Sequence, residues 1–189
     1  MSLILYTTLS GIAIYHELLN HKDKLRKRRE AVNGKIQWYS LNWPRRKKLF
    51  EQAKILIRQT ANKILAAYDN EQWYCLKSAL IIQLPKESKI SYFYLLGLLN
   101  STLMDFIYRD MVDEDIRIFP EVKPVQLFKL PIEDSNHDVQ EQIEKVVNQI
   151  LATKKHNPKA DTSKLESKID QLVYKLYSLT EEEIAIVDR

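Results

Sequence analysis

Hydrophobic side chains along this 189-residue chain follow two periods, one typical of strands and one typical of helices. Short runs rich in aliphatic, β-branched and aromatic residues predict strands, and the clearest buried strand is Ala53–Arg58. Together, five such runs with short connections predict a mainly antiparallel sheet, with Asp69-Asn70 as a hairpin-like turn. The five runs cover residues 36–41, 53–58, 64–68, 73–75 and 80–84, and further strand candidates lie at 3–6 and 116–119.

Helical spacing of apolar residues predicts helices around these strands. One is expected from Tyr15 to Glu30, after a turn near Ser10-Gly11, and Asn33-Gly34 should end it. A helical turn is expected at residues 47–52, and a long amphipathic helix at 91–109 whose apolar stripe we interpret as core.

The chain changes character from Val139 onward. Apolar residues at positions 139, 143, 146 and 150 form a seam of the coiled-coil kind, and a second seam follows at 165, 169, 172 and 176. Capping boxes are expected at Ser163/Glu166 and Thr180/Glu183, the latter opening a last short helix over 181–187. The predicted fold is therefore α+β, with a globular domain over 1–132 and a helical hairpin with a short last helix over 133–189.

Charge divides the chain in a similar way, although the net charge is only +4. Residues 22–63 hold 14 Lys and Arg against three acids, whereas residues 133–189 hold 12 acids against eight bases. A basic first part indicates a face for a polyanion such as nucleic acid, and the acidic part indicates a separate role. The alternative is that both charge runs are ordinary solvated surface.

The stretch Gly34–Arg58 combines this basic charge with Trp38, Tyr39 and Trp43. Cations neutralise phosphates and aromatic rings give stiff apolar contact, so this stretch is the candidate face for DNA. A tryptophan pair in the core beside a solvated basic turn is the alternative.

Other chemistry finds little support in the sequence. A single cysteine, Cys75, fits a reducing cytoplasm, and neither a membrane-spanning run nor a signal peptide is evident. Four dispersed histidines and three glycines give no metal-ligand spacing and no phosphate-binding loop, so we expect no cofactor, metal or catalytic site in this chain. Glu87-Ser88-Lys89 resembles half of a nuclease motif, but Glu166-Ser167-Lys168 repeats it within a predicted helix. No glycine loop or ribonucleoprotein-type aromatic motif favours RNA.

Motifs along the whole chain resemble the TaqI-type C-terminal specificity domain, the target-recognition domain of restriction-modification DNA methyltransferases. Their order and spacing carry the resemblance: LIL at 3–5, YHELLNHKDKLRKRR at 15–29, GK at 34–35, WYSL at 38–41, WPR at 43–45, LFE at 49–51, KI at 54–55, WYCL at 73–76, LLGLLNS at 95–101, LPI at 130–132, QI at 142–143 and the run 169–184. The LPI segment followed by a helix also resembles recognition domains of type I specificity subunits. One departure is the acidic segment Asp113–Phe119, where the family often has glycines.

The resemblance implies an α/β domain that reads a short asymmetric sequence in double-stranded DNA and docks on a methyltransferase domain or subunit. The parent enzyme would methylate adenine at N6 with S-adenosylmethionine, and would need Mg²⁺ where it also cleaves DNA. Neither the Asn-Pro-Pro-Tyr motif nor the cofactor-binding glycine loop of such enzymes occurs here. The chain would thus be a specificity part that is inactive alone.

Two groups of residues are the candidate DNA contacts. Phosphate contacts that position the domain are assigned to Lys35, Arg45, Arg46, Lys47 and Lys48. Base contacts are assigned to Arg58, Gln59 and Asn62, which follow the central predicted strand. Trp38 and Trp43 are interpreted as structural supports. The rival hypothesis is a protein-docking module whose helical hairpin binds a partner and whose basic face is incidental.

Overall fold

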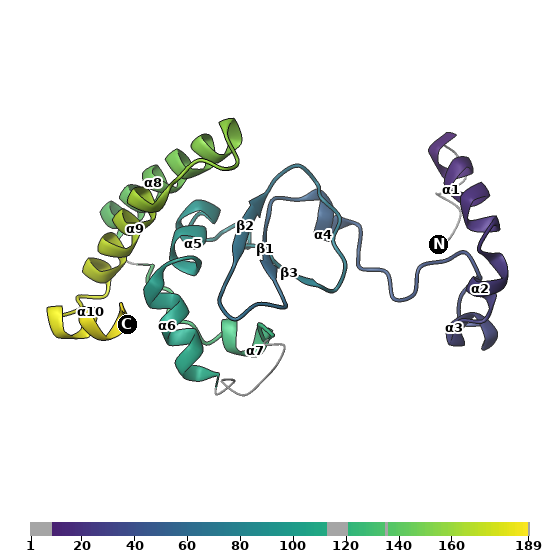
Figure 1. The fold of residues 1–189 in the computed structure, drawn as a ribbon, viewed down its shortest axis with the longest axis horizontal. Helices are drawn as coiled ribbons and strands as arrows, with labels where there is room; N and C mark the ends of the chain where they lie inside the picture. Colours follow the sequence, from purple (N-terminus) through teal and green to yellow (C-terminus); the bar gives the residue numbers. More distant parts are fainter. Residues whose placement is uncertain (1–8, 113–120, 135, 189) are drawn as a thin grey trace. The chain divides into compact units, whose positions relative to one another are not determined.

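The computed structural model describes residues 9–112, 121–134 and 136–188, which divide into two compact units, Met1–Arg46 and Lys47–Arg189 (Figure 1). The strand candidates at 3–6 and 116–119 lie outside the described residues. Each unit is described separately. The predicted α+β class, with an antiparallel sheet and packed helices, is confirmed.

Among its described residues, the first unit contains three short helices, α1 (Leu9–Leu19), α2 (Lys22–Arg26) and α3 (Arg29–Val32). The prediction of one helix over 15–30 was wrong, and so was the turn near Ser10-Gly11, which lies within α1. The chain turns at Asn20 and again at Arg28, whose main chain is extended. As predicted, the helical segment ends at Asn33-Gly34, where Gly34 has a φ of 69° that side chains disfavour.

A turn, and not the predicted strand, occupies residues 36–41. The Arg28 guanidinium donates hydrogen bonds to the carbonyl oxygens of Trp38 and Ser40, each at 2.8 Å. The Trp38 ring lies against Tyr15 and Tyr39, with centroid distances of 5.8 and 5.4 Å. The planar guanidinium uses the carbonyls that a strand ladder would need, and this explains why the β-like sequence forms a turn.

The second unit is built on a three-stranded antiparallel sheet in the order β2-β1-β3, within the described residues (Figure 1). The strands are β1 (Lys54–Arg58), β2 (Ala66–Asp69) and β3 (Ala79–Ile82), which confirms three of the predicted segments. Residues 73–75 form no strand, contrary to prediction. Because β2 and β3 lie on opposite sides of β1, Asp69-Asn70 opens a long crossing loop and no hairpin.

Helices cover one face of this sheet in successive layers (Figure 1). Ile55 and Ile57 of β1 belong to a buried core shared with α5 (Tyr92–Leu99). The predicted helix over 91–109 is in fact two helices, because Ser101 takes an extended conformation and caps α6 (Thr102–Met111) through the Met104 N–H. At this break the Asn100 side chain binds the main-chain N–H and C=O of Ala66, both at 3.0 Å, and so extends the edge of β2.

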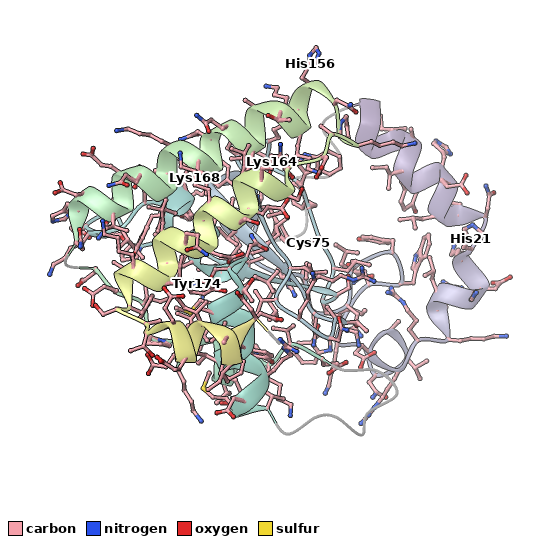
Figure 2. The ribbon with its side chains drawn as sticks, turned by 60° about the vertical axis from the view of Figure 1, so that its left-hand side comes forward. His21, Cys75, His156, Lys164, Lys168 and Tyr174 are labelled. Carbon is pink, nitrogen blue, oxygen red and sulfur yellow. The ribbon has the colours of Figure 1, made fainter. Side chains whose placement is uncertain are left out.

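The predicted helical hairpin is confirmed as α8 (His137–His156) and α9 (Ser163–Leu176), with His156 at its tip (Figure 2). The first seam packs inside the unit, against α5. Ile143 approaches Gly97 of α5 so closely that a Cβ added to Gly97 would lie 2.5 Å from Ile143 Cγ2. The prediction of a Ser163/Glu166 capping box was wrong. Thr162 is the N-cap of α9, and its hydroxyl donates to Glu166 at 2.5 Å. The Thr180/Glu183 box, which opens α10 (Glu181–Val187), is confirmed.

The Leu-Pro-Ile segment joins the helical hairpin to the rest of the unit. Leu130 is buried, the Tyr177 hydroxyl of α9 donates to the Pro131 carbonyl at 2.5 Å, and the Tyr94 hydroxyl of α5 donates to the Glu133 carbonyl at 2.7 Å. Burial raises the pKa of Tyr94 and that of Tyr177, so both hydroxyls stay protonated donors even where a solvent-exposed tyrosine would begin to ionise. This segment is therefore bonded to helices on both sides. The functional boundary at residue 132 stays a prediction.

A buried ion pair stands at the start of the central strand. Lys54 is fully buried, and its Nζ lies 2.5 Å from Asp69 Oδ2 and 2.6 Å from the Phe50 carbonyl oxygen at the end of α4 (Lys48–Glu51). Asp69 also accepts hydrogen bonds from the N–H groups of Glu71 and Trp73. The pair thus joins α4, β1, β2 and the loop that follows β2.

We expect Lys54→Met to lower the free energy of unfolding by about 3–5 kcal/mol, because it leaves the Asp69 charge buried without its cation. Chemical denaturation measures this change. Lys86→Met, at an exposed lysine in a loop, is the matched control and should change the free energy by less than about 0.5 kcal/mol. A loss below about 1 kcal/mol for Lys54→Met would contradict the role of the pair.

Candidate nucleic-acid interface

Arg58 and Gln59 lie where the central strand ends, and their main chain is held on several sides. The Arg58 N–H donates to the Leu65 carbonyl at 3.0 Å, and the Gln59 N–H donates to the Ser78 carbonyl at 2.9 Å. The Gln59 carbonyl accepts from the Val122 N–H at 2.7 Å. The Arg58 side chain is exposed and that of Gln59 is half-buried. Two side chains suited to reading base edges are thus presented from a fixed main chain.

Residues distant in sequence meet these two at the same end of the sheet. Lys77 and Ser78 adjoin Gln59, and an isolated bridge pairs Thr60 with Glu121. Val125 of α7 (Pro124–Leu127) and Phe128 follow the bridged segment and are 67% and 87% exposed. The third predicted base contact, Asn62, is exposed in the loop between β1 and β2. Sequence reasoning missed Lys77, Ser78 and Phe128, because nothing in the chain signals that residues 78 and 122 both bond to Gln59.

Lys47 and Lys48 lie at the start of α4, which confirms the helical turn predicted at residues 47–52. Lys47 Nζ is 2.9 Å from Glu51 Oε1, and both side chains are accessible to solvent. The hydrogen bond to Glu51 and its negative charge raise the pKa of Lys47 and so favour further the charged form that lysine already has at neutral pH. Lys48 is exposed. This turn can therefore offer cations to phosphate.

The other three predicted phosphate contacts belong to the first unit. Lys35 follows Gly34 and is exposed, and its N–H donates to the Glu30 carbonyl at 2.8 Å. Arg46 is exposed and Arg45 is half-buried. Three of the eight predicted contacts thus belong to the first unit and five to the second. Within the second unit, Lys47 and Lys48 lie on the turn that precedes β1, whereas Arg58, Gln59 and Asn62 lie at and beyond the other end of that strand. Trp38 is packed among aromatic rings, as expected of a support, but Trp43 is 80% exposed and is not a packed support.

Known proteins resemble much of this sequence. A model of the TaqI-like C-terminal specificity domain matches residues 9–132, which is more than half of the chain. The chain belongs to this family. The resemblance inferred from the sequence motifs is thereby confirmed, and the chain is a specificity domain of the restriction-modification kind.

Part of this TaqI-like domain is also similar to a curated protein. The chain is 41% identical over 58 residues to the protein named Putative type II restriction enzyme and methyltransferase of Methanocaldococcus jannaschii. The match covers 29% of this chain and 5% of that protein. The chain thus spans a small fraction of the length of this relative.

A pocket of about 430 Å³ lies between the edge of β2, the junction of α5 and α6, and the hairpin helices α8 and α9. Its polar lining is already engaged: Asn100 binds Ala66, Asp105 accepts from the Ile64 N–H at 3.1 Å, and Asp170 accepts from the N–H and hydroxyl of Thr102 at 2.8 and 3.0 Å. These groups hold the sheet, α6 and α9 together. We therefore interpret the pocket as a structural seam between these elements.

Among residues 9–112, 121–134 and 136–188, no group of three His, Cys, Asp or Glu could hold a metal ion. Lys89 of the half-motif at 87–89 lies 3.8 Å from Asp134, in an exposed pair. Helices in the same ranges include none that is long and apolar enough to cross a membrane.

Asp170 lines the pocket, and its carboxyl should make the stability of the protein depend on pH. Burial raises its pKa, and the Thr102 hydrogen bonds offset this only in part. A carboxyl whose pKa is raised by folding favours the native state in its protonated form, and this contribution is lost as pH rises through the folded pKa. We expect Asp170→Asn, which keeps an acceptor for the Thr102 N–H, to be at least as stable as the wild type at pH 7. Its advantage should shrink as pH falls towards 4.

Denaturation midpoints of both proteins at pH 4 and 7 measure this difference. Asp170→Ala is the control, because it leaves the Thr102 N–H without its acceptor and should lose about 1–3 kcal/mol at both values. An equal loss for Asn at both pH values would contradict the electrostatic account.

Proposed function

We propose that this TaqI-like domain recognises a short asymmetric sequence in double-stranded DNA, as the specificity part of a restriction-modification adenine methyltransferase or endonuclease. The observation that carries the proposal is the end of the sheet, where Arg58 and Gln59 extend from a main chain that neighbouring segments hold in place. Arginine pairs with guanine and glutamine with adenine through two hydrogen bonds each, so these side chains suit the major groove. Family membership over residues 9–132 supports the same role.

Recognition would combine positioning with readout. Lys47 and Lys48 of the second unit, with Lys35, Arg45 and Arg46 of the first, would bind phosphates and fix the register. Arg58, Gln59 and Asn62 would then meet base edges. The first unit supports this division, since it contains nine Lys and Arg against three acids.

Catalysis would belong to the partner methyltransferase domain or subunit. Transfer of a methyl group from S-adenosylmethionine to adenine N6 needs a cofactor site, which we assign to that partner because the polar groups lining the pocket of this chain hold its own elements together. What this chain contributes is binding and orientation of the DNA. A docking role for the hairpin seam has less support, because Ile143 and Val146 are buried within the unit.

Selection from a random duplex library at two salt concentrations tests the proposal. We expect the full chain to retain one short asymmetric sequence, with weaker retention at the higher salt because counterions are released on binding. Retention without enrichment would contradict sequence-specific reading by this chain alone. No retention at either concentration would contradict DNA binding altogether.

Variants separate the two groups of contacts. Arg45→Ala with Arg46→Ala should weaken binding to every duplex and reduce the slope of log K against log salt by up to about two. Gln59→Ala should instead change base preference at one position by about 1–3 kcal/mol and leave the slope alone. Filter binding to the selected sequence and its single-base variants measures both. An unchanged slope in the double variant would remove Arg45 and Arg46 from the interface.

A further inference from the structure

The loop from Asn70 to Ser78 connects the two groups of contacts in the second unit. At its start, Asp69 accepts hydrogen bonds from the N–H groups of Glu71 and Trp73, at 2.8 and 3.1 Å. In its middle, the Tyr74 ring stacks on Phe50 of α4, with centroids 4.5 Å apart. At its end, the Ser78 carbonyl accepts from Gln59. The loop is thus fixed to the lysine turn at one point and to the end of the sheet at another.

Large apolar side chains remain exposed on this anchored loop. Trp73 is 65% exposed, Tyr74 60% and Leu76 80%. The Trp73 indole Nε1–H donates to Glu71 Oε2 at 3.3 Å, and its own N–H is held by Asp69. An aromatic ring that the main chain holds in place and that solvent reaches indicates a contact for a ligand.

The charge around the loop indicates which ligand this is. Tyr74 stacks on Phe50 of the same short helix that Lys47 caps and Lys48 begins. Lys77 lies within the loop, and Arg58 pairs with Ala79 just beyond it. Glu71 and Glu51 are engaged with Trp73 and Lys47 respectively. Cations on both sides of exposed rings favour a nucleic acid over a protein partner.

We propose that Trp73 is a DNA-contact residue, whose ring packs against sugar and base between the phosphates bound by Lys47 and Lys48 and the bases read by Arg58 and Gln59. This inference rests on the proposed function and adds a contact that the resemblance does not assign. The ring supplies apolar contact area, so it strengthens binding to all sequences alike. It neutralises no phosphate and therefore releases no counterion.

Binding of the full chain to the selected duplex and to an unrelated duplex tests this contact. Trp73→Ala should weaken binding to both by about 5- to 150-fold, the range for loss of one aromatic contact, without changing the salt slope. Trp73→Phe should recover most of the loss. Ile186→Ala on α10, at a residue 49% exposed, is the control and should bind as the wild type does.

A second measurement uses the wild-type chain and so does not depend on the folding of a variant. Oxidative footprinting with mass spectrometry should show that the duplex protects Trp73 from modification, while Ile186 stays reactive. Binding by the wild type together with unprotected Trp73, or with equal affinity in the folded Trp73→Ala variant, would overturn this inference and leave the proposed function standing. Failure of the wild type to bind either duplex would overturn both.

Discussion

The second unit depends on the buried ion pair between Lys54 and Asp69. Burying two charges is costly, and it is favourable only where further hydrogen bonds satisfy both groups. Here Lys54 also binds the carbonyl at the end of α4, and Asp69 binds two N–H groups of the crossing loop. One interaction therefore fixes the positions of a helix, two strands and a loop. Three of these elements carry the residues that we assign to DNA.

This arrangement explains how a small sheet could read a sequence. The main chain of Gln59 is bonded to Ser78, just before β3, and to Val122, just before α7. The residue at position 59 can therefore be exchanged without moving the main chain around it. Recognition surfaces commonly combine such a rigid main chain with variable exposed side chains. Cations on α4 and apolar rings on the crossing loop would add affinity for DNA that does not depend on sequence. In the proposed function, positioning and reading are thus assigned to different elements that share one support.

The helical hairpin supports the sheet and is more than a spacer. Its seam packs on α5, where Gly97 leaves room for Ile143, and two tyrosines bond the Leu-Pro-Ile segment to α5 and α9. Asp170 of α9 also caps the start of α6 through Thr102. A change in the hairpin would therefore reach the sheet through packed helices. Figure 2 shows Tyr174 on α9, whose hydroxyl bonds to Asp188 after α10, so that the last helix is held to the hairpin as well.

The sequence by itself determined the fold class, the central strand, the hairpin seams and the last capping box, because these depend on local periodicity and on side chains a few residues apart. It also carried the motifs by which the family is identified. Two of its errors fall where a partner further along the chain overrides local preference. Arg28 bonds the carbonyls of a β-like segment that forms a turn, and at the break in the amphipathic helix Asn100 binds Ala66 and Thr102 binds Asp170. Only the tertiary structure decided that Ser78 and Val122 meet at Gln59, and that the crossing loop stacks on α4. These contacts join segments from 19 to 63 residues apart, and no local pattern of hydrophobic or charged positions encodes such pairings.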